Sequence, residues 1–242
     1  MTINKVSKEP AQKLQVFIAG ETIDLCIPNK NPEILRTWSD WLNDPEVNTY
    51  LAQGIFPHSV ISQAEYVDQH KKSDRIVLLI RPKNNDYIVG VISLSRIDMQ
   101  NRNASIAHLI GFKDGKPDSI FYSLEAKAIL TRHAFEKIGL KMIYCQQVLD
   151  LINWQRWQPL FGYFFEGINR YVVRYGNNYY DAIRTSCIID DYQRIKEARG
   201  GNIWPGKDKV FELLKKTNHL KTLEELKRWL NDKYSDIRNN IE

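Results

Sequence analysis

The 242-residue sequence has few cysteines and lacks the short motifs that mark several large enzyme classes. It contains three Cys and no CxxC pair, HExxH pair, Gly-rich Walker loop or Gly-x-Ser-x-Gly elbow. Four of its five histidines are scattered along the chain rather than paired at ligand spacing: His58, His70, His133 and His219. These absences argue against a metal site and against a disulfide framework.

The three cysteines, Cys26, Cys145 and Cys187, fall within apolar, strand-like runs. A free Cys in such a run acts as a small hydrophobe, and a reactive thiol is the alternative.

Long apolar runs and strong charge are also missing. No uninterrupted apolar run approaches the roughly 20 residues that a membrane-spanning helix needs, and the opening Met1–Pro10 has no signal-peptide core. We therefore expect a cytoplasmic protein with no membrane contact. The net charge of +5 comes from dispersed basic residues, which suits an anionic small molecule and not nucleic acid. A hydrophobic content of 43% is ample for a packed core.

The most informative stretch is a strand, a long helix and a second strand between Ser105 and Val148. The strand Ser105–Gly111 leads through a polar loop to Asp118 and Ser119, which are helix-starting residues. Gly139 follows the helix where a C-terminal cap belongs, and Leu140–Val148 has the composition of a buried strand. The apolar positions of the helix recur at three- and four-residue steps: Leu124, Ala128, Phe135 and Ile138. This order predicts a βαβ unit with parallel strands.

The start of the Ser119 helix could bind an anion. Backbone N–H groups there have no partner inside the helix, and the macrodipole adds positive charge. Lys113 and Lys116 lie just before it. The alternative is an ordinary surface helix with lysines nearby.

Further elements surround this unit. The patterns predict a strand Val16–Pro28, a helix after the Asn31–Pro32 cap, a second helix headed by a Ser62–Glu65 capping box, strands Arg75–Pro82 and Asp86–Ile97 around an Asn84–Asp86 turn, and two strands joined at Gly176–Asn178.

A C-terminal extension is expected after Asp190. Val210, Phe211 and Leu214 suggest one helix, and a Thr222–Glu225 capping box heads another. Their apolar stripes pack against the same chain, or form a subunit contact or a wall of a substrate cleft. The predicted domains are residues 1–189 and 190–242.

The chain resembles the GNAT superfamily of N-acyltransferases over roughly its first three quarters, by fold analogy. The matching segments are Trp41–Val47, Ile88–Leu94, Asn103–Ile106, Ile110–Asp114, Glu125–Ala126, Gly139–Leu140, Asn153, Gly162–Gly167 and Asn177–Asp181. The resemblance implies an α/β (α+β) fold: a mixed twisted sheet with a splayed parallel strand pair, flanking helices and, here, a C-terminal helical extension.

The resemblance also implies an acyl-CoA co-substrate, acetyl-CoA or another acyl-CoA, and no metal. In the family the pantetheine arm lies between the splayed strands as an added strand would, and a backbone N–H polarises the thioester carbonyl. The predicted residues for acyl-CoA are Leu109, Ile110, Lys113, Lys116, Ser119, Ile120, Phe121, Tyr122 and Asn153.

Two departures from the family pattern stand out. Ser119, Phe121 and Ser123 replace the glycines of the usual pyrophosphate loop. Gln158 stands nearest the place of the Tyr that protonates the leaving thiolate in many members. Because a thiolate is a fairly stable leaving group near neutral pH, water can replace that acid.

His108 is the candidate general base, since imidazole titrates in the useful range and the residue lies where the thioester is expected. An ordinary hydrogen-bonded histidine on a strand face is an equal alternative.

For the acceptor, the chain looks most like enzymes that N-acylate nucleotide-linked amino sugars for surface polysaccharide and lipopolysaccharide biosynthesis. Trp154 and Trp157 are candidate platforms for the sugar or base, or else core residues. The alternatives are N-acetylation of a protein N-terminus or a polyamine, and a non-catalytic acyl-CoA-binding or scaffold module. A homodimer is a further expectation.

Overall fold

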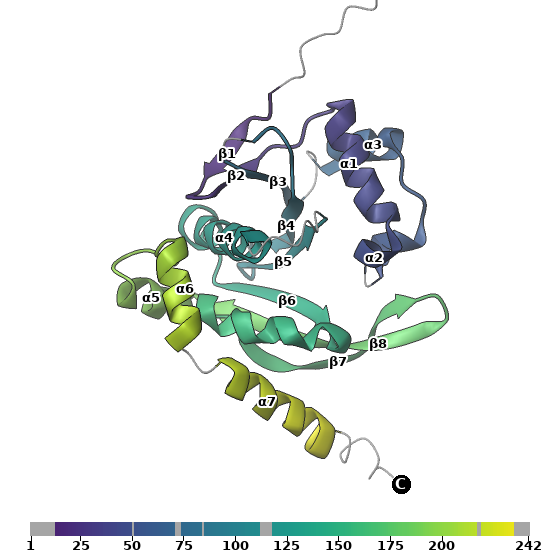
Figure 1. Cartoon of the computed structure of the whole chain (residues 1–242). Helices are drawn as coiled ribbons and strands as arrows, with labels where there is room; N and C mark the ends of the chain where they lie inside the picture. Colours follow the sequence, from purple (N-terminus) through teal and green to yellow (C-terminus); the bar gives the residue numbers. More distant parts are fainter. Residues whose placement is uncertain are drawn as a thin grey trace, which may run out of the picture. The chain divides into compact units, whose positions relative to one another are not determined.

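The computed structural model describes residues 13–49, 51–70, 74–83, 85–111, 118–216 and 219–234. Within these ranges the chain forms a mixed sheet flanked by helices (Figure 1). The strands are β1 (Val16–Ala19), β2 (Ile23–Cys26), β3 (Ile76–Pro82), β4 (Gly90–Asp98), β5 (Asn103–Ile110), β6 (Met142–Val148), β7 (Phe164–Tyr175) and β8 (Asn178–Ile188). The α-helices are α1 (Pro32–Asn43), α2 (Pro45–Asn48), α3 (Val60–His70), α4 (Asp118–His133), α5 (Ile189–Ala198), α6 (Lys207–Lys216) and α7 (His219–Trp229). Short 3₁₀ segments cover Ala52–Ile55 and Leu149–Phe161, and π-helical turns cover Ala134–Ile138 and Leu230–Tyr234.

The sheet order is β1-β2-β3-β4-β5-β6-β8-β7. β5 and β6 are parallel, and β1–β2, β2–β3, β6–β8 and β7–β8 are antiparallel. Because α4 connects β5 to β6, the predicted βαβ unit and mixed sheet are confirmed. Gly139 ends the π-helical turn after α4 with φ of 79°, which confirms the predicted cap.

The parallel pair has a short register. Asn103 faces Met142, and the ladder ends where Ser105 faces Tyr144, although β6 continues to Val148. β8, in contrast, pairs with β6 along its whole length, from Met142 with Ile188 to Val148 with Ala182. Among the described residues, β5 therefore pairs with the N-terminal half of β6 and not with Cys145–Val148.

The chain divides into two compact units. The first contains Met1–Ser93 and His108–Ala126, and the second contains Leu94–Ala107 and Lys127–Glu242.

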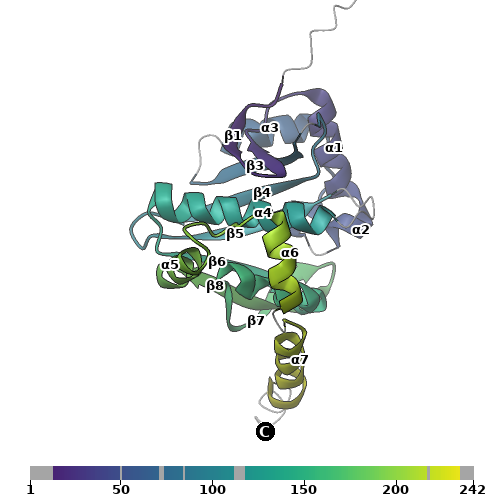
Figure 2. The same cartoon turned by 60° about the vertical axis from the view of Figure 1, so that its left-hand side comes forward.

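A helical layer and a buried cross-strand pair mark the first unit. Asn31 accepts a hydrogen bond from the Glu33 amide, and Pro32 begins α1 as predicted. α1 packs against α3 (Figure 2). Between these helices the Trp38 and Tyr66 rings are edge-to-face, with their centroids 5.6 Å apart. The core cluster under these helices includes Leu14, Ile34, Leu35, Trp38, Trp41, Leu42, Val67, Val77, Leu79 and Ile88.

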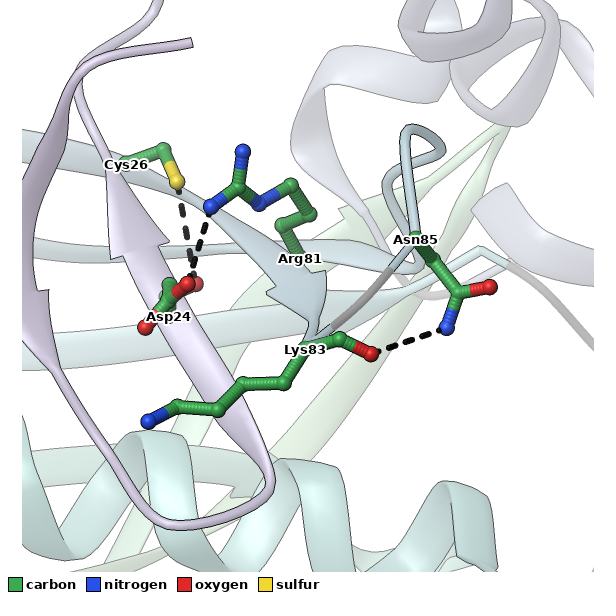
Figure 3. Close-up of polar contacts among 5 residues, drawn as sticks. All are labelled: Asp24, Cys26, Arg81, Lys83 and Asn85. Carbon is green, nitrogen blue, oxygen red and sulfur yellow. Dashed lines mark hydrogen bonds and ion pairs between the residues drawn. The ribbon is translucent and has the colours of Figure 1, made fainter.

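On β2 and β3, Asp24 and Arg81 are directly opposed and form a 2.8 Å ion pair (Figure 3). Their side chains are 11% and 12% exposed. Cys26 lies beside them, and burial raises the pKa of its thiol. This ion pair stabilises the register of β2 and β3, because separating the two side chains would leave a desolvated charge on each strand.

The predicted single strand Val16–Pro28 is wrong, because the chain turns back after Ala19 to form β1 and β2. The cause lies far away in the sequence: Glu125 of α4 accepts hydrogen bonds from the Glu21 amide and from the amide and hydroxyl of Thr22. Burial raises the pKa of Glu125, and the bonds from Thr22 and Glu21 oppose that shift.

Both predicted capping boxes are also wrong. α3 begins at Val60 because Ser59, not Ser62, accepts from a helical amide, that of Ser62 at 3.1 Å. α7 begins at His219, three residues before Thr222.

In the second unit, β7 and β8 form a long hairpin whose turn is at Gly176, with φ of 59° (Figure 1). This confirms the predicted connection. Near a bulge of β7, Tyr171 has φ of 53°, and its amide donates to Asp181 at 2.9 Å.

The C-terminal extension packs within this second unit. Lys227 of α7 donates to Asn153 at 3.0 Å, and Trp229 lies 5.8 Å from the Phe165 ring. Before α6, Arg199 donates to the Leu160 and Ile203 carbonyls at 2.6 and 2.8 Å. Burial lowers the pKa of Arg199 to about 10. The extension thus packs against its own chain, whereas the domain boundary after residue 189 stays a prediction.

Among the helices of the described ranges, none combines the length and the apolar character that crossing a bilayer requires.

Candidate functional site

The end of β5 carries three of the predicted site residues, His108, Leu109 and Ile110. All three are half-buried, and Leu109 packs against the core cluster of the first unit. The next amide, of Gly111, donates to the Val89 carbonyl at 3.0 Å. The strand end is therefore held by both side-chain packing and a backbone bond.

Two glycines permit this packing. A Cβ on Gly90 would lie 2.3 Å from the Leu109 carbonyl oxygen, and a Cβ on Gly111 would lie 2.0 Å from the Trp41 ring. Real Cβ atoms do not approach so closely. The resemblance assigns the Leu109 backbone to acyl-CoA. This backbone can lie close to β4 because Gly90 has no side chain.

The start of α4 carries four more of these residues. Ser119, Ile120, Phe121 and Tyr122 lie in the first turn and a half of a helix that begins at Asp118. The first amides of a helix have no intrahelical acceptor, so this end favours an anion. Lys113 and Lys116 lie outside the described residues. One turn further on, the Ser123 hydroxyl is buried and has no hydrogen-bond partner within the described part of the chain.

The remaining predicted residues belong to the second unit and to one segment, Leu149–Phe161. Asn153 is exposed, and its side-chain oxygen accepts from Lys227. Trp154 and Trp157 are half-buried, and the Arg156 guanidinium lies 4.2 Å from the Trp157 ring. The structure thus groups His108–Ile110 with Ser119–Tyr122 in one unit, and Asn153 with the two tryptophans in the other.

Sequence reasoning missed a buried polar cluster around Lys127 of α4. The Lys127 ammonium is 3.6 Å from the centre of the Tyr163 ring, donates to Gln158, and is 3.5 Å from Cys145 Sγ. Two threonines complete it: Thr131 lies 2.8 Å from the Tyr163 hydroxyl, and Thr185 lies 3.0 Å from Cys145 Sγ. We call Lys127, Thr131, Cys145, Gln158, Tyr163 and Thr185 the lysine cluster.

Burial dominates the electrostatics of the lysine cluster. Lys127 is 2% exposed, and desolvation lowers the pKa of its ammonium. Desolvation also raises the pKa of Tyr163 well above its ordinary value. The ammonium has the Gln158 oxygen, a sulfur and an aromatic face as partners, and none of these three is a carboxylate.

One sequence signal for this cluster was available. Lys127 follows Ala126 and precedes Ala128, Ile129 and Leu130, so it is a charged residue inside an apolar helical run. A lysine in that position must be either buried with partners or placed on an exposed stripe.

Within the described ranges, no group of three or more His, Cys, Asp or Glu side chains is arranged to hold a metal ion.

No family model matches the chain, and no curated protein matches its sequence. Solved structures do match its fold. A spermidine N-acetyltransferase from Vibrio cholerae, in complex with CoA and spermine, is 16% identical with a TM-score of 0.62, covering 71% of this chain and 98% of that one. RimL, a ribosomal L7/L12 alpha-N-protein acetyltransferase in complex with coenzyme A, is 14% identical with a TM-score of 0.62, covering 73% and 99%.

A third similar structure is the Microcin C7 self immunity acetyltransferase MccE in complex with acetyl-CoA and AMP. It is 19% identical with a TM-score of 0.59, covering 70% of this chain and 94% of that one. These similarities confirm the predicted fold class, a mixed α/β fold that several acetyltransferases share.

Proposed function

We propose that this protein is an acyl-CoA-dependent N-acyltransferase. The observation that carries the proposal is the β5–α4–β6 unit, with its short parallel ladder and a helix starting at Asp118, in a fold shared with acetyltransferases that bind CoA. Fold similarity alone does not define an activity, so the residues of the unit must supply the rest of the argument.

Those residues suit the parts of an acyl-CoA. The Leu109 and Ile110 backbone groups at the end of β5 would pair with the pantetheine amides, as an added strand does. The amides of Ser119 to Tyr122 would bind the pyrophosphate, with Lys113 and Lys116 preceding them in sequence. Asn153 would provide a further polar contact, and its present partner, Lys227, adds a positive charge beside it.

The chemistry needs no covalent intermediate on the protein. The neutral amine attacks the thioester carbonyl carbon, the C–N bond forms, the C–S bond breaks, and CoA leaves as a thiolate. A backbone amide at the end of β5 stabilises the oxyanion. His108, directly or through a water, accepts the proton that the amine loses.

The leaving thiolate takes its proton from water. Gln158, which stands where a tyrosine acid is expected, is 4% exposed, and its side-chain oxygen accepts from Lys127. A carboxamide has no acidic proton to give. Gln158 therefore has a structural part in the lysine cluster and does not replace the tyrosine.

For the acceptor we propose a nucleotide-linked amino sugar. The half-buried Trp154 and Trp157 offer aromatic faces on a single segment, and MccE, which shares the fold, is described with a nucleotide, AMP, beside acetyl-CoA.

The second candidate acceptor is a polyamine or a protein N-terminus. Two solved structures of similar fold, the spermidine N-acetyltransferase and RimL, favour it. A polyamine needs uncompensated acidic side chains. Asp24 and Glu166, two of the acidic groups on the sheet, are instead paired with Arg81 and Arg184.

The acceptor can be identified by measuring free CoA release from acetyl-CoA and longer acyl-CoAs. The panel contains dTDP- and UDP-linked amino sugars, spermidine, and a peptide with a free N-terminus. We expect turnover with an amino sugar at least about 100-fold above the other amines, since a site built for polar groups strongly rejects compounds that lack them. Turnover with the peptide or spermidine alone would overturn the sugar proposal and leave N-acyl transfer intact.

Calorimetric titration with CoA separates the enzyme from a non-catalytic module. Binding without turnover on any amine would favour an acyl-CoA-responsive module, and no binding would favour a scaffold.

A His108→Gln variant tests the general base. We expect kcat/KM for the amine to fall by about 100-fold and the acidic limb of the pH–rate profile to change, because the proposed base would be gone and the acceptor ammonium would be left to shape that limb. His133→Gln, on the last turn of α4, is the matched control and should retain the profile. Unchanged turnover and pH profile in His108→Gln would show that water alone removes the proton.

A further inference from the structure

Cys145 and Lys127 form a close contact between a thiol and an amine inside the second unit. Cys145 Sγ on β6 lies 3.5 Å from the Lys127 Nζ on α4. Lys127 is 2% exposed, whereas Cys145 is half-buried. Cys145 is therefore the more accessible residue of the two, and the Lys127 amine is shielded from water.

The other two thiols are more deeply buried than that of Cys145. Cys26 and Cys187 are both 0% exposed. Burial raises the pKa of Cys187 to about 12, so it stays a protonated thiol. Since thiol oxidation depends on exposure, Cys145 is the site that an oxidant should attack first.

We propose that Lys127 and Cys145 form a covalent N–O–S bridge when the protein is oxidised by a peroxide. One molecule of hydrogen peroxide oxidises the Cys145 thiol to a sulfenic acid and leaves as water. A second molecule replaces the sulfenic hydroxyl with a hydroperoxide, S–O–OH, and releases another water.

The Lys127 amine then attacks the oxygen bonded to sulfur. The N–O bond forms, the O–O bond breaks, and the outer oxygen leaves as water with one proton from the amine. Sulfur and nitrogen each lose two electrons, and the O–O bonds of the two peroxides receive them. The net change is one oxygen gained and two hydrogens lost.

The geometry favours this bridge over two competing products. The nitrogen and sulfur atoms are 3.5 Å apart, and a direct N–S bond would require them to move closer together than a bridge through one oxygen atom does. A disulfide with Cys187 is disfavoured by the sheet register, because Cys145 faces Thr185 and Cys187 faces Ile143. Desolvation lowers the pKa of Lys127, which favours the neutral amine that the attack requires.

The bridge would tie α4 to β6 and take the Lys127 ammonium away from Gln158. The proposal concerns this chain's own residues, so its test does not depend on acyl transfer.

The experiment is intact and peptide mass spectrometry of the full-length protein, treated with hydrogen peroxide and compared with untreated protein. We expect a mass about 14 Da higher and a cross-linked peptide containing Lys127 and Cys145, both reversed by dithiothreitol. Cys145→Ser and Lys127→Met should lose the shift, and Cys187→Ala should retain it.

A peroxide product that carries oxygen on Cys145 alone would overturn the proposal, as would a Cys145–Cys187 disulfide about 2 Da lighter than the untreated protein. If Lys127→Met does not fold, the cross-linked peptide of the wild-type protein decides the question by itself.

Discussion

A Gly90→Ala variant is expected to lose about 3 kcal/mol of unfolding free energy, the upper range for overpacking a filled site. Its added Cβ would lie 2.3 Å from the Leu109 carbonyl oxygen, which is backbone and cannot rotate away. The end of β5 must therefore move. Because a displacement of about 1 Å at a reacting centre can lower a rate about 100-fold, acyl-transfer turnover should fall by that order. Urea unfolding and CoA-release kinetics measure the two effects.

Gly167→Ala on β7 is the matched control. No atom lies within 4 Å of a Cβ at this position, and its backbone is not left-handed. We expect its stability to change by less than about 0.5 kcal/mol. If Gly90→Ala kept wild-type stability and wild-type affinity for CoA, the tight packing of β4 against Leu109 would be wrong.

A Lys127→Ala variant is expected to lose about 3 kcal/mol of unfolding free energy, as other long buried side chains do on truncation. It leaves a cavity beside the Tyr163 ring and removes the donor from the buried Gln158 oxygen. Lys127→Met fills the same space without a charge, so its loss should be less than about 1.5 kcal/mol. Lys137→Ala, exposed on the following π-helical turn, should stay within about 0.5 kcal/mol of the wild type.

The pH dependence of the same variants reports the charge of Lys127. Its pKa in the folded protein is below the ordinary value of 10.5, so between the two values the unfolded chain binds more protons than the folded protein. Stability relative to Lys127→Met should therefore rise as pH increases toward about 10.5, and should level off above it. The comparison between the two proteins cancels the titration of groups that Lys127 does not influence, such as Cys26. A relative stability that falls with pH would mean that the ammonium is stabilised by its surroundings.

Much of the fold around α4 could be predicted because its signals are local. Asp118 and Gly139 mark the ends of one helical stretch, and the apolar runs on either side have strand composition. Local patterns were misleading where a distant group decides the outcome. The β1–β2 turn depends on Glu125, about a hundred positions further along. The capping box at Ser62 was wrong for a local reason, because Ser59 is better placed to accept from a helical amide.

The candidate site was predictable only in part, for the same reason. His108 to Ile110 and Ser119 to Tyr122 were found from a family pattern that follows chain order. The lysine cluster was not, because its members come from α4, β6, β8 and the segment before β7, and no spacing along the chain relates them. A lone lysine in an apolar run shows that a partner is needed, but not which residue it is.

Through the guanidinium of Arg199, the segment after β8 contributes to the packing of the second unit. A protein shortened to end at Asp190 would leave the Leu160 carbonyl without its donor, and would uncover Phe161, whose ring stacks with that of Trp204. Those groups directly precede Tyr163, a neighbour of the buried amine. Removing the C-terminal extension would thus expose apolar surface, and we expect the shortened protein to aggregate more than the full-length chain.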